Sequence, residues 1–332
     1  MLRNKSIFIS GGTGSFGQEF VRNIISKYKK FNRLIIFSRD EFKQYEMSKI
    51  FSPKKYPFIR YFLGDVRDTS RLRFALKEID IVVHAAALKH VSAAEYDPFE
   101  FIKTNVLGAQ NIIEACIANK VKKVIALSTD KAVSPINLYG ATKLCSDKLF
   151  LAANNITGNN PTTFSIVRYG NVMSSRGSVI PYFLTLKKNK KKLPLTDINM
   201  TRFHITLEQA ANTVIWSIYN CLGGEVIVNK IPSIKILDLI KALKSDYEIT
   251  GIGPGEKIYE ELLQSSDSRS TLELKNYYII LSNYKNYDKI LSYYKKKFSA
   301  KFVPDNFSYN SQKNNFLSVN EIRNQIEKIE VL

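Results

Sequence analysis

The sequence predicts an α/β fold built on a mostly parallel sheet that helices cover on both faces. Nearly continuous apolar runs of strand length alternate with segments of helical period through the first half of the chain, a pattern typical of such sheets. A glycine-rich turn joins the first apolar run to the first helical segment. The 332 residues, 45% of them hydrophobic, are also enough to bury a large core.

The expected elements follow one another as repeated βα units. Residues 6–10 form a short apolar run that ends in glycines, residues 18–28 have a helical period, and residues 33–38 form a second apolar run. Together they predict a βαβ unit. Later segments predict strands at residues 58–63, 79–84, 123–128, 163–168 and 225–228, and helices at residues 43–50, 70–77, 98–119 and 139–154. This order indicates a doubly wound, Rossmann-like sheet.

The regular alternation loosens after about Asn171. Loops rich in Gly, Pro and Lys separate the remaining expected elements, at residues 207–221, 236–244 and 277–280. We therefore expect a core over residues 1–170 and a smaller lobe mainly over residues 171–332, from which some segments return to the core.

The chain is strongly basic, with a formal net charge of +19 from 49 Lys and Arg against 30 Asp and Glu. Much of this charge lies in lysine runs, such as those at residues 187–192 and 295–297. Such runs favour anionic ligands or nucleic acid in general. None of the motifs of nucleic-acid-binding proteins occurs in the sequence, so we expect a lysine-rich surface and a phosphorylated substrate, and no nucleic-acid partner.

Other residue types exclude further classes of protein. The three cysteines are far apart and have no histidine beside them, which suits a reducing compartment. The three histidines show no metal-ligand spacing, so we expect no metal site. No apolar run reaches the roughly 18 residues of a membrane-spanning helix. We expect a cytoplasmic protein that has no membrane partner.

The glycine-rich turn predicts a cofactor site. It follows a strand and opens a helix, which is the setting that a dinucleotide-binding turn requires. Its glycines permit a tight turn and a close approach of the backbone to a pyrophosphate, and the helix N-terminus supplies N–H donors. We therefore expect a dinucleotide-binding core, with cofactor contacts from Gly11, Thr13, Gly14, Ser15, Phe16 and Gly17.

The residues after the second strand discriminate between the two nicotinamide dinucleotides. Arg39, which follows Ser38, can hold a 2′-phosphate, and Lys43 lies one helical turn further on. This arrangement favours NADP. In the alternative, Asp40 or Glu41 binds the ribose hydroxyls of NAD and Arg39 is only an exposed side chain. The other expected cofactor contacts follow the third and fourth strands: Asp65, Val66 and Ala86.

Two acid/base pairs lie within residues 127–143. Tyr139 and Lys143 are one helical turn apart, so we expect the Lys143 ammonium to lower the pKa of Tyr139. A phenol tuned in this way can take a proton from a substrate alcohol. Asp130 and Lys131 form the second pair, at the carboxyl end of the fifth strand, where parallel sheets bind ligands. This second pair predicts more proton chemistry than a simple dehydrogenase needs.

With these motifs the chain resembles an extended short-chain dehydrogenase/reductase and, more closely, the inverting UDP-N-acetylglucosamine 4,6-dehydratases of the PseB type. The resemblance runs nearly from end to end. Its most discriminating element is Thr129-Asp130-Lys131, because retaining sugar-nucleotide 4,6-dehydratases carry Asp-Glu at that point. Other shared motifs are Gly64-Asp-Val-Arg-Asp68, His84-Ala-Ala-Ala-Leu-Lys-His-Val91, Arg168-Tyr-Gly-Asn-Val172, Ser175-Arg-Gly-Ser-Val179, Met200-Thr-Arg-Phe203 and Pro254-Gly-Glu-Lys257.

The resemblance implies a role for each member of the two pairs. Tyr139, helped by Lys143, would deprotonate the C-4 hydroxyl as hydride leaves for NADP, and Thr129 would hydrogen-bond the same oxygen. Lys131 would remove the C-5 proton, and Asp130 would protonate the departing C-6 hydroxyl. Return of the hydride to C-6 would recycle the NADP, and a proton would reach C-5 from the opposite face. The product would be the 4-keto sugar that begins pseudaminic-acid-type synthesis.

The resemblance also implies contacts to the UDP-sugar substrate from Lys89, Asn171, Val172, Arg176 and Arg202, with Arg176 near the phosphates. One departure affects this set. Related enzymes carry an arginine where this chain has Gly253, so that contact is either missing or supplied by Lys257. Helices like those expected at residues 98–119 and 143–154 form dimer faces in related enzymes, which implies a homo-oligomer, either a dimer or a larger assembly such as a hexamer.

Alternatives to this mechanism remain open. Catalysis needs Lys131 neutral and Asp130 protonated, yet an adjacent Asp and Lys stabilise each other's charged forms. Either desolvation outweighs this attraction, or the pair exchanges a proton as a unit. A sugar-nucleotide epimerase or reductase of the same class would leave Lys131 without a chemical role. A basic nucleic-acid-binding protein on a degenerate scaffold is the remote alternative, against which Tyr139 and Lys143 count.

Overall fold

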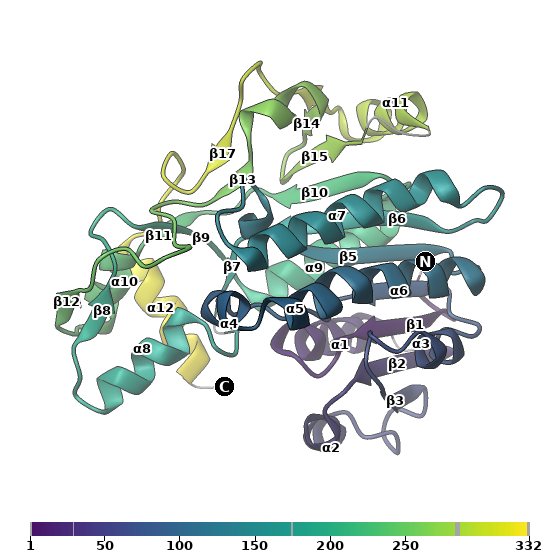
Figure 1. The fold of residues 1–332 in the computed structure, drawn as a ribbon, viewed down its shortest axis with the longest axis horizontal. Coiled ribbons are helices and arrows are strands. Elements are labelled where there is room, and N and C mark those ends of the chain that lie inside the picture. The colour runs from purple at the N-terminus through teal and green to yellow at the C-terminus, as the bar shows by residue number, and fades with distance from the viewer. Residues whose placement is uncertain (1, 29, 174, 283–285, 331–332) are drawn as a thin grey trace.

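A computed structural model describes residues 2–28, 30–173, 175–282 and 286–330. Its central sheet has the strand order β16-β14-β15-β10-β6-β5-β4-β1-β2-β3 (Figure 1). From β10 to β3 all neighbours pair in parallel, which confirms the predicted α/β class. These strands are β1 (Ser6–Ser10), β2 (Arg33–Ser38), β3 (Ile59–Leu63), β4 (Ile81–His84), β5 (Lys123–Thr129), β6 (Thr163–Tyr169) and β10 (Glu225–Asn229).

Three antiparallel strands extend this sheet at one edge. They are β14 (Thr271–Glu273), β15 (Tyr277–Leu281) and β16 (Lys301–Phe302). The segment expected at residues 277–280 therefore lies in the main sheet, as β15 beside β10. Residues from the second half of the chain thus complete the sheet that the first half begins.

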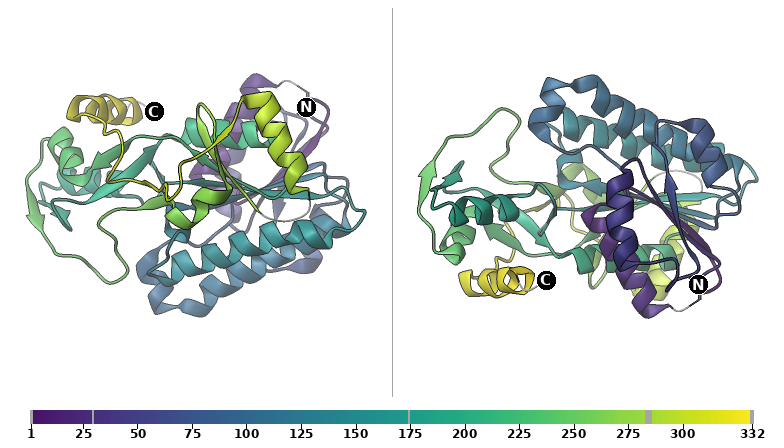
Figure 2. Two further views of the ribbon diagram at one scale, coloured as in Figure 1. Left: turned by 90° about the horizontal axis from the view of Figure 1, so that it is seen from above. Right: turned by 90° about the horizontal axis from the view of Figure 1, so that it is seen from below.

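Helices cover both faces of the sheet. Helices α3, α6 and α7 lie together on one face, and α1 and α9 pack against each other on the other face (Figures 1 and 2). The main-sheet helices are α1 (Ser15–Lys27), α2 (Glu41–Ile50), α3 (Thr69–Ala75), α4 (Val91–Tyr96), α5 (Pro98–Phe101), α6 (Gly108–Ala118), α7 (Leu138–Ile156), α9 (Leu207–Asn220) and α11 (Tyr287–Phe298). Two short 3₁₀ turns are η2 (Asp130–Ala132) and η3 (Ser265–Ser270).

The single helix expected at residues 98–119 is interrupted. A π-helical segment, η1 (Ile102–Leu107), separates α5 from α6. Within it, the buried Asn105 side chain accepts a hydrogen bond from the Leu88 N–H (2.8 Å) and donates to the Leu88 carbonyl (2.9 Å) and the Thr142 hydroxyl (3.1 Å). The Asn105 amide thus reaches the loop after β4 from the wider π-helical turn. Such π-bulges are frequent at functional sites.

A smaller lobe with its own apolar core lies beyond the carboxyl ends of the parallel strands (Figure 1). Phe183, Leu195, Leu239 and Ile322 are among its buried residues. The lobe contains α8 (Val179–Lys188), α10 (Ile236–Leu243), α12 (Val319–Glu330) and the paired strands β8 (Leu193–Leu195) and β12 (Tyr247–Ile249). Between lobe and sheet lie β7 (Asn171–Val172), β9 (Thr201–Ile205), β11 (Ser233–Lys235), β13 (Glu261–Leu263) and β17 (Tyr309–Asn310).

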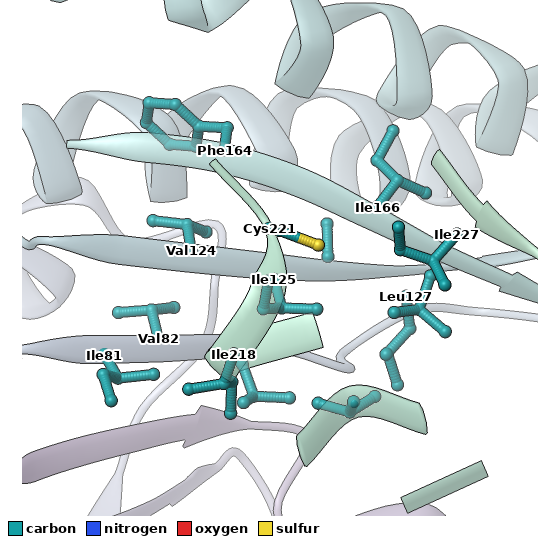
Figure 3. Close-up of a cluster of buried hydrophobic side chains, with 14 of the residues drawn as sticks. Ile81, Val82, Val124, Ile125, Leu127, Phe164, Ile166, Ile218, Cys221 and Ile227 are labelled. Carbon is teal, nitrogen blue, oxygen red and sulfur yellow. The ribbon is translucent and has the colours of Figure 1, made fainter. Parts of the chain in front are cut away.

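The core of the main sheet is continuous and apolar. Val82, Val124, Ile125 and Phe164 are fully buried on the neighbouring strands β4, β5 and β6, and Ile218 of α9 belongs to the same apolar cluster (Figure 3). Burial on both faces explains why these strands have apolar sequences without alternation. Among the described residues, no helix is both long and apolar enough to cross a membrane.

His84 ends β4 as a buried polar residue. Its Nδ1 lies 2.8 Å from the Ser10 hydroxyl, and its ring packs against Phe150, with 5.5 Å between the centroids. Burial and, to a lesser extent, the charge of Lys143 lower the pKa of His84 to about 3. The neutral imidazole is therefore the form that fits the fold.

We predict that His84 makes the fold sensitive to acid. Its pKa is about 6.5 when unfolded and about 3 when folded, so its contribution to stability is present above the unfolded value and is lost as the pH falls toward the folded one. The loss is up to about 1.4 kcal/mol per pH unit. Urea unfolding across that range should give a shallower pH dependence for His84→Asn, and His90→Asn, at an exposed site, should keep the wild-type slope.

Candidate active site

The residues predicted to bind the cofactor or to transfer protons lie at the carboxyl ends of parallel strands. The glycine-rich turn follows β1, the alanines after residue 84 follow β4, and η2 follows β5. Since β1 neighbours β4, and β4 neighbours β5, these segments meet at one sheet edge. Ligands of open parallel sheets bind at this edge.

Close backbone packing shapes the cofactor side of this edge. Gly11 has a φ of +66°, and a Cβ on it would lie 2.8 Å from the Ala86 nitrogen. A Cβ on Gly17 would collide with the Gly12 carbonyl, so helix α1 can lie on the turn only with glycine there. The N-cap residue of α1, Gly14, offers no side-chain cap to the first turn, which leaves its N–H groups suited to a phosphate.

The other predicted residues of this turn hold it in place. The Thr13 carbonyl accepts a hydrogen bond from Gln18 (3.1 Å), and the Phe16 ring stacks on Tyr169 with 6.4 Å between centroids. The Ser15 hydroxyl accepts a hydrogen bond from the Arg176 N–H (3.1 Å). Arg176, which we predicted to lie near the phosphates of the substrate, therefore lies beside the glycine-rich turn.

The carboxylate of Asp40 is occupied by its own helix. It accepts a hydrogen bond from the Lys43 N–H (2.9 Å) as the N-cap of α2, and it pairs with the Lys43 ammonium (2.7 Å). These bonds hold the pKa of Asp40 below its usual value. Arg39 is more than half exposed and lies 3.8 Å from Asp65. The Ser38 carbonyl accepts a hydrogen bond from the Gln44 side chain (3.0 Å).

The cofactor contacts predicted after β3 and β4 are held in place by their neighbours. The Asp65 carboxylate accepts hydrogen bonds from the Arg67 backbone (2.9 Å) and guanidinium (2.8 Å), which outweigh its burial and lower its pKa. Val66 is buried, and its carbonyl accepts from Asn111 (3.1 Å). Ala86 donates its N–H to the Ser10 hydroxyl (3.3 Å).

Tyr139 and Lys143 lie on the first turns of α7, which Asn137 caps through the Gly140 N–H (2.8 Å). Both side chains are buried. Our expectation that Lys143 lowers the pKa of Tyr139 is wrong for this structure: burial raises that pKa to about 12, and the charge of Lys131 and a hydrogen bond with Thr129 offset it only in part. The Lys143 ammonium instead donates to the Leu127 carbonyl (2.8 Å).

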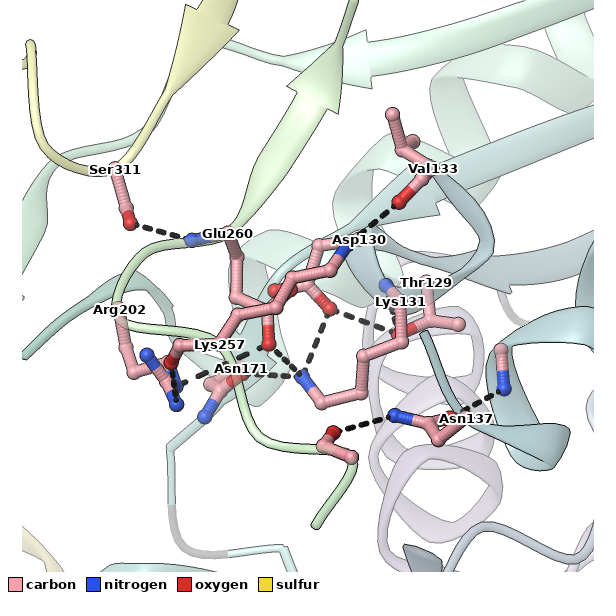
Figure 4. A network of polar contacts seen from close by, with 12 residues as sticks. Thr129, Asp130, Lys131, Val133, Asn137, Asn171, Arg202, Lys257, Glu260 and Ser311 are labelled. Carbon is pink, nitrogen blue, oxygen red and sulfur yellow. Dashed lines mark hydrogen bonds and ion pairs between the residues drawn. The ribbon is translucent and has the colours of Figure 1, made fainter. Parts of the chain in front are cut away.

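The second pair is joined in a polar network (Figure 4). The Lys131 ammonium donates to Asp130 Oδ1 (3.0 Å) and to Asn171 Oδ1 (3.2 Å), and the Thr129 hydroxyl also donates to Asp130 Oδ1 (2.9 Å). Asp130 is fully buried, whereas about a quarter of the Lys131 side chain is exposed. Lys131 is therefore the member of the pair that faces the site.

A second carboxylate, which the sequence analysis missed, completes this network. Glu260 Oε1 lies 3.3 Å from the Lys131 ammonium, and Glu260 is buried. Burial alone would lower the pKa of Lys131, but the charges of Asp130 and Glu260 outweigh it and raise that pKa above its ordinary value. Because attraction outweighs desolvation here, the first of the two possibilities left open by the sequence is disfavoured, and the ammonium form of Lys131 is favoured.

Two of the residues predicted to bind substrate, Asn171 and Lys89, lie near this ammonium, whereas Val172 packs against the main apolar core. Asn171 contacts it directly, and Val172 is the next residue of β7. The Lys89 ammonium lies 3.4 Å from the Ser175 hydroxyl, and its pKa is lowered by partial burial and by the charge of Lys131. Two amines and an amide thus face one site, an arrangement suited to an anionic or oxygen-rich ligand.

Arg202 and Lys257 hold the backbone instead of facing the site. The Arg202 guanidinium donates to the carbonyls of Thr201 (2.7 Å) and Lys257 (2.8 Å). The Lys257 ammonium donates to the carbonyl of Val133 (2.8 Å), just past η2. In the structure both residues therefore attach the segment that leads to Glu260 to the region of the turn η2.

Within the described parts of the chain, no group of three or more His, Cys, Asp or Glu side chains is placed to hold a metal ion. The chemistry that the site offers is proton transfer, through Tyr139, Lys131 and the two carboxylates beside Lys131.

Comparison with known proteins agrees with this fold. A sequence profile of the family described as polysaccharide biosynthesis protein matches residues 7–282. The UDP-N-acetylglucosamine 4,6-dehydratase (inverting) of Campylobacter jejuni is 51% identical over 95% of this chain and 94% of that protein. The UDP-glucose 4-epimerase of Rickettsia bellii is 40% identical over 97% of this chain and 96% of that protein.

Solved structures share the architecture. The X-ray structure of Pen from Bacillus thuringiensis superposes with a TM-score of 0.89 at 38% identity, over 100% of both chains. The dTDP-glucose 4,6-dehydratase DesIV from Streptomyces venezuelae, solved with NAD and TYD bound, has a TM-score of 0.71 at 20% identity and covers 88% of this chain and 97% of that one. The fold is that of an extended short-chain dehydrogenase/reductase. Within that class, the chain belongs to the polysaccharide biosynthesis protein family.

We predict that Gly140 cannot carry a side chain. A Cβ there would collide with the Lys131 carbonyl oxygen, so Gly140→Ala should push η2 away from α7 and lower the free energy of unfolding by about 1–3 kcal/mol. Urea denaturation provides the measurement. The control is Gly253→Ala, whose Cβ would approach Glu256 no closer than 3.5 Å and should change stability by less than about 0.5 kcal/mol. Equal stability of the two variants would contradict the packing argument.

Proposed function

We propose that this protein is a UDP-N-acetylglucosamine 4,6-dehydratase that inverts the configuration at C-5. The observation that carries the proposal is the position of Lys131, whose amine faces the same site as Tyr139. An enzyme that only oxidises and reduces C-4 has no use for it. The higher identity to a dehydratase (51%) than to an epimerase (40%) supports the same choice. The resemblance noted in the sequence extends the proposal to the first step of pseudaminic-acid-type synthesis.

We propose that the core within residues 1–170 holds NADP and that residues 171–332 mainly contact the UDP-sugar. The tight turn that Gly11 permits, and the α1 N-terminus without a side-chain cap, fit a pyrophosphate. The commitment of Asp40 to Lys43 leaves Arg39 as the better partner for a 2′-phosphate. The NAD bound in DesIV supports a nicotinamide dinucleotide in this fold. A bound dinucleotide would supply reversible hydride transfer, from C-4 and back to C-6.

The chain's own side chains move the protons. Tyr139 must be in its phenolate form, which burial disfavours, to take the proton of the C-4 hydroxyl. Thr129 hydrogen-bonds the same oxygen. Lys131 must release one proton before it can take the C-5 proton, because the structure favours its ammonium form. The Asp130 carboxylate, which accepts a hydrogen bond from that ammonium, can take up the released proton. The C-6 hydroxyl takes up a proton and leaves as water. Asp130 has no exposed surface, so its proton reaches the substrate through Lys131 or Thr129, which both hydrogen-bond Oδ1.

We also propose that the protein self-associates. Tyr96, Phe99 and Leu107 are 92%, 58% and 49% exposed on the neighbouring segments α4, α5 and η1. Large apolar side chains that gather on adjoining elements are typical of interaction surfaces. They lie at the start of the helical region from which the resemblance implied a dimer face.

Incubation with UDP-N-acetylglucosamine in deuterated water, followed by NMR, tests the function. We expect loss of water and deuterium at an inverted C-5; epimerisation at C-4 without loss of water would favour the epimerase instead. Lys131→Ala should slow dehydration by at least about 100-fold because it removes the base. Lys148→Ala, at an exposed position on α7, should leave the rate unchanged. Normal dehydration by Lys131→Ala would contradict the mechanism.

Titration calorimetry with NADP⁺ and NAD⁺ tests the cofactor assignment. Arg39→Ala should weaken NADP⁺ binding by roughly 10- to 100-fold, since it removes a charge-assisted contact to the 2′-phosphate, and should change NAD⁺ binding little. Arg73→Ala, an exposed arginine on α3, is the matched control. If Arg39→Ala weakens both dinucleotides equally, selection by Arg39 is excluded.

A further inference from the structure

Glu260 is a buried carboxylate at the centre of the site. It directly precedes β13, is 3% exposed, and brings Oε1 to 3.3 Å from the Lys131 ammonium (Figure 4). It comes from a segment about 130 residues away along the chain and approaches Lys131 from the side opposite to the backbone of η2 (Figure 4). Lys131 is thus held between two carboxylates, those of Asp130 and Glu260.

The position of Glu260 does not depend on Lys131 alone. Its N–H donates to the Ser311 hydroxyl (3.0 Å), and its carbonyl accepts from the Ser311 N–H (2.8 Å). The Ser311 hydroxyl is also 2.9 Å from the Thr201 hydroxyl, which ties this contact to β9. Arg202 fastens the preceding residues, and its Nε lies 4.0 Å from Glu260 Oε1. The fold therefore presents the carboxylate from a fixed backbone.

Within the described residues, each of the two carboxylates has one oxygen that does not contact Lys131 and that lacks a hydrogen-bond donor. Asp130 Oδ2 and Glu260 Oε2 are buried, and neither has a hydrogen-bond partner in the described structure. A buried carboxylate oxygen without a donor costs free energy. The backbone around Glu260 is firmly held, yet the fold retains this unfavourable buried oxygen. We therefore infer that the charge of Glu260 serves the site and not the stability of the fold.

The charges around Lys131 come from every element packed against it. Two are negative, two are positive, and one group is a neutral phenol: Asp130 of η2, Glu260 before β13, Arg202 of β9, Lys89 before α4 and Tyr139 of α7. Arg202 and Lys89 favour release of the Lys131 proton, whereas the carboxylates oppose it. The carboxylates lie closer, since Glu260 is in ion-pair contact with the ammonium.

We propose that Glu260 is a positioning residue for Lys131, which holds the amine in the site and by its negative charge sets the pH above which Lys131 can act as a base. This inference rests on the proposed dehydratase function. It assigns Glu260 no bond-making step: the proton at C-5 still passes to Lys131. The role differs from that of a structural ion pair, because removal of the charge should change the pH dependence of the reaction and not only its rate.

The test is the pH profile of C-5 deuterium incorporation in Glu260→Gln. Glutamine keeps the shape of the side chain and an oxygen acceptor but removes the charge. The rate should then begin to rise at a pH lower than in the wild type by roughly one to three units, the effect of one close charge in a partly shielded site. Glu261→Gln, at the neighbouring position in β13, should retain the wild-type profile.

A second variant keeps the test decisive if Glu260→Gln does not fold. Glu260→Asp retains the charge but moves it away from Lys131 by one methylene. The pH at which the rate begins to rise should therefore also be lower than in the wild type, but by less than in Glu260→Gln. Profiles of both variants that rise at the wild-type pH, however slow the reaction, would overturn the inference. Failure of the wild-type protein to lose water from the substrate would instead overturn the proposed function, so the two failures are distinguishable.

Discussion

The contact between the first turn of α7 and the turn η2 is the constraint on which the site depends. The backbone of Lys131 lies so close to Gly140 that no side chain fits between them. Because Tyr139 adjoins Gly140, and Asp130 adjoins Lys131, this one contact fixes both acid/base pairs relative to each other. Asn137 adds a cap to the same helix turn, and its amide also donates to the Gly255 carbonyl (2.8 Å), which brings in the segment that carries Glu260.

The parts of the fold that the sequence predicted are those governed by local pattern. The first two strands were expected at residues 6–10 and 33–38 and lie there, because a strand buried on both faces is apolar throughout and ends abruptly at polar residues or glycine. The glycine-rich turn was recognisable for a similar local reason. The break at η1 was not, since it depends on Asn105 reaching Leu88 in another segment.

The candidate site shows the same division. Thr129, Asp130, Lys131 and Tyr139 could be found because they lie within one short stretch. Glu260 lies among other glutamates, and no spacing or periodicity distinguishes it. The error about Tyr139 has a related cause: the sequence shows which charges are near along a helix, but burial and the carbonyl of Leu127 decide what those charges do.

Because Ser311 follows the parallel strands of the central sheet in the sequence, the site can be completed only late in synthesis. Its hydroxyl and backbone hold Glu260, and through Glu260 they reach the catalytic amine. During synthesis the parallel strands emerge first and can pair among themselves. The polar network cannot close until residues beyond 311 have left the ribosome. A growing chain can therefore pair its first parallel strands before the contacts of Ser311 hold Glu260 beside Lys131, so the polar network around Lys131 is completed late in synthesis.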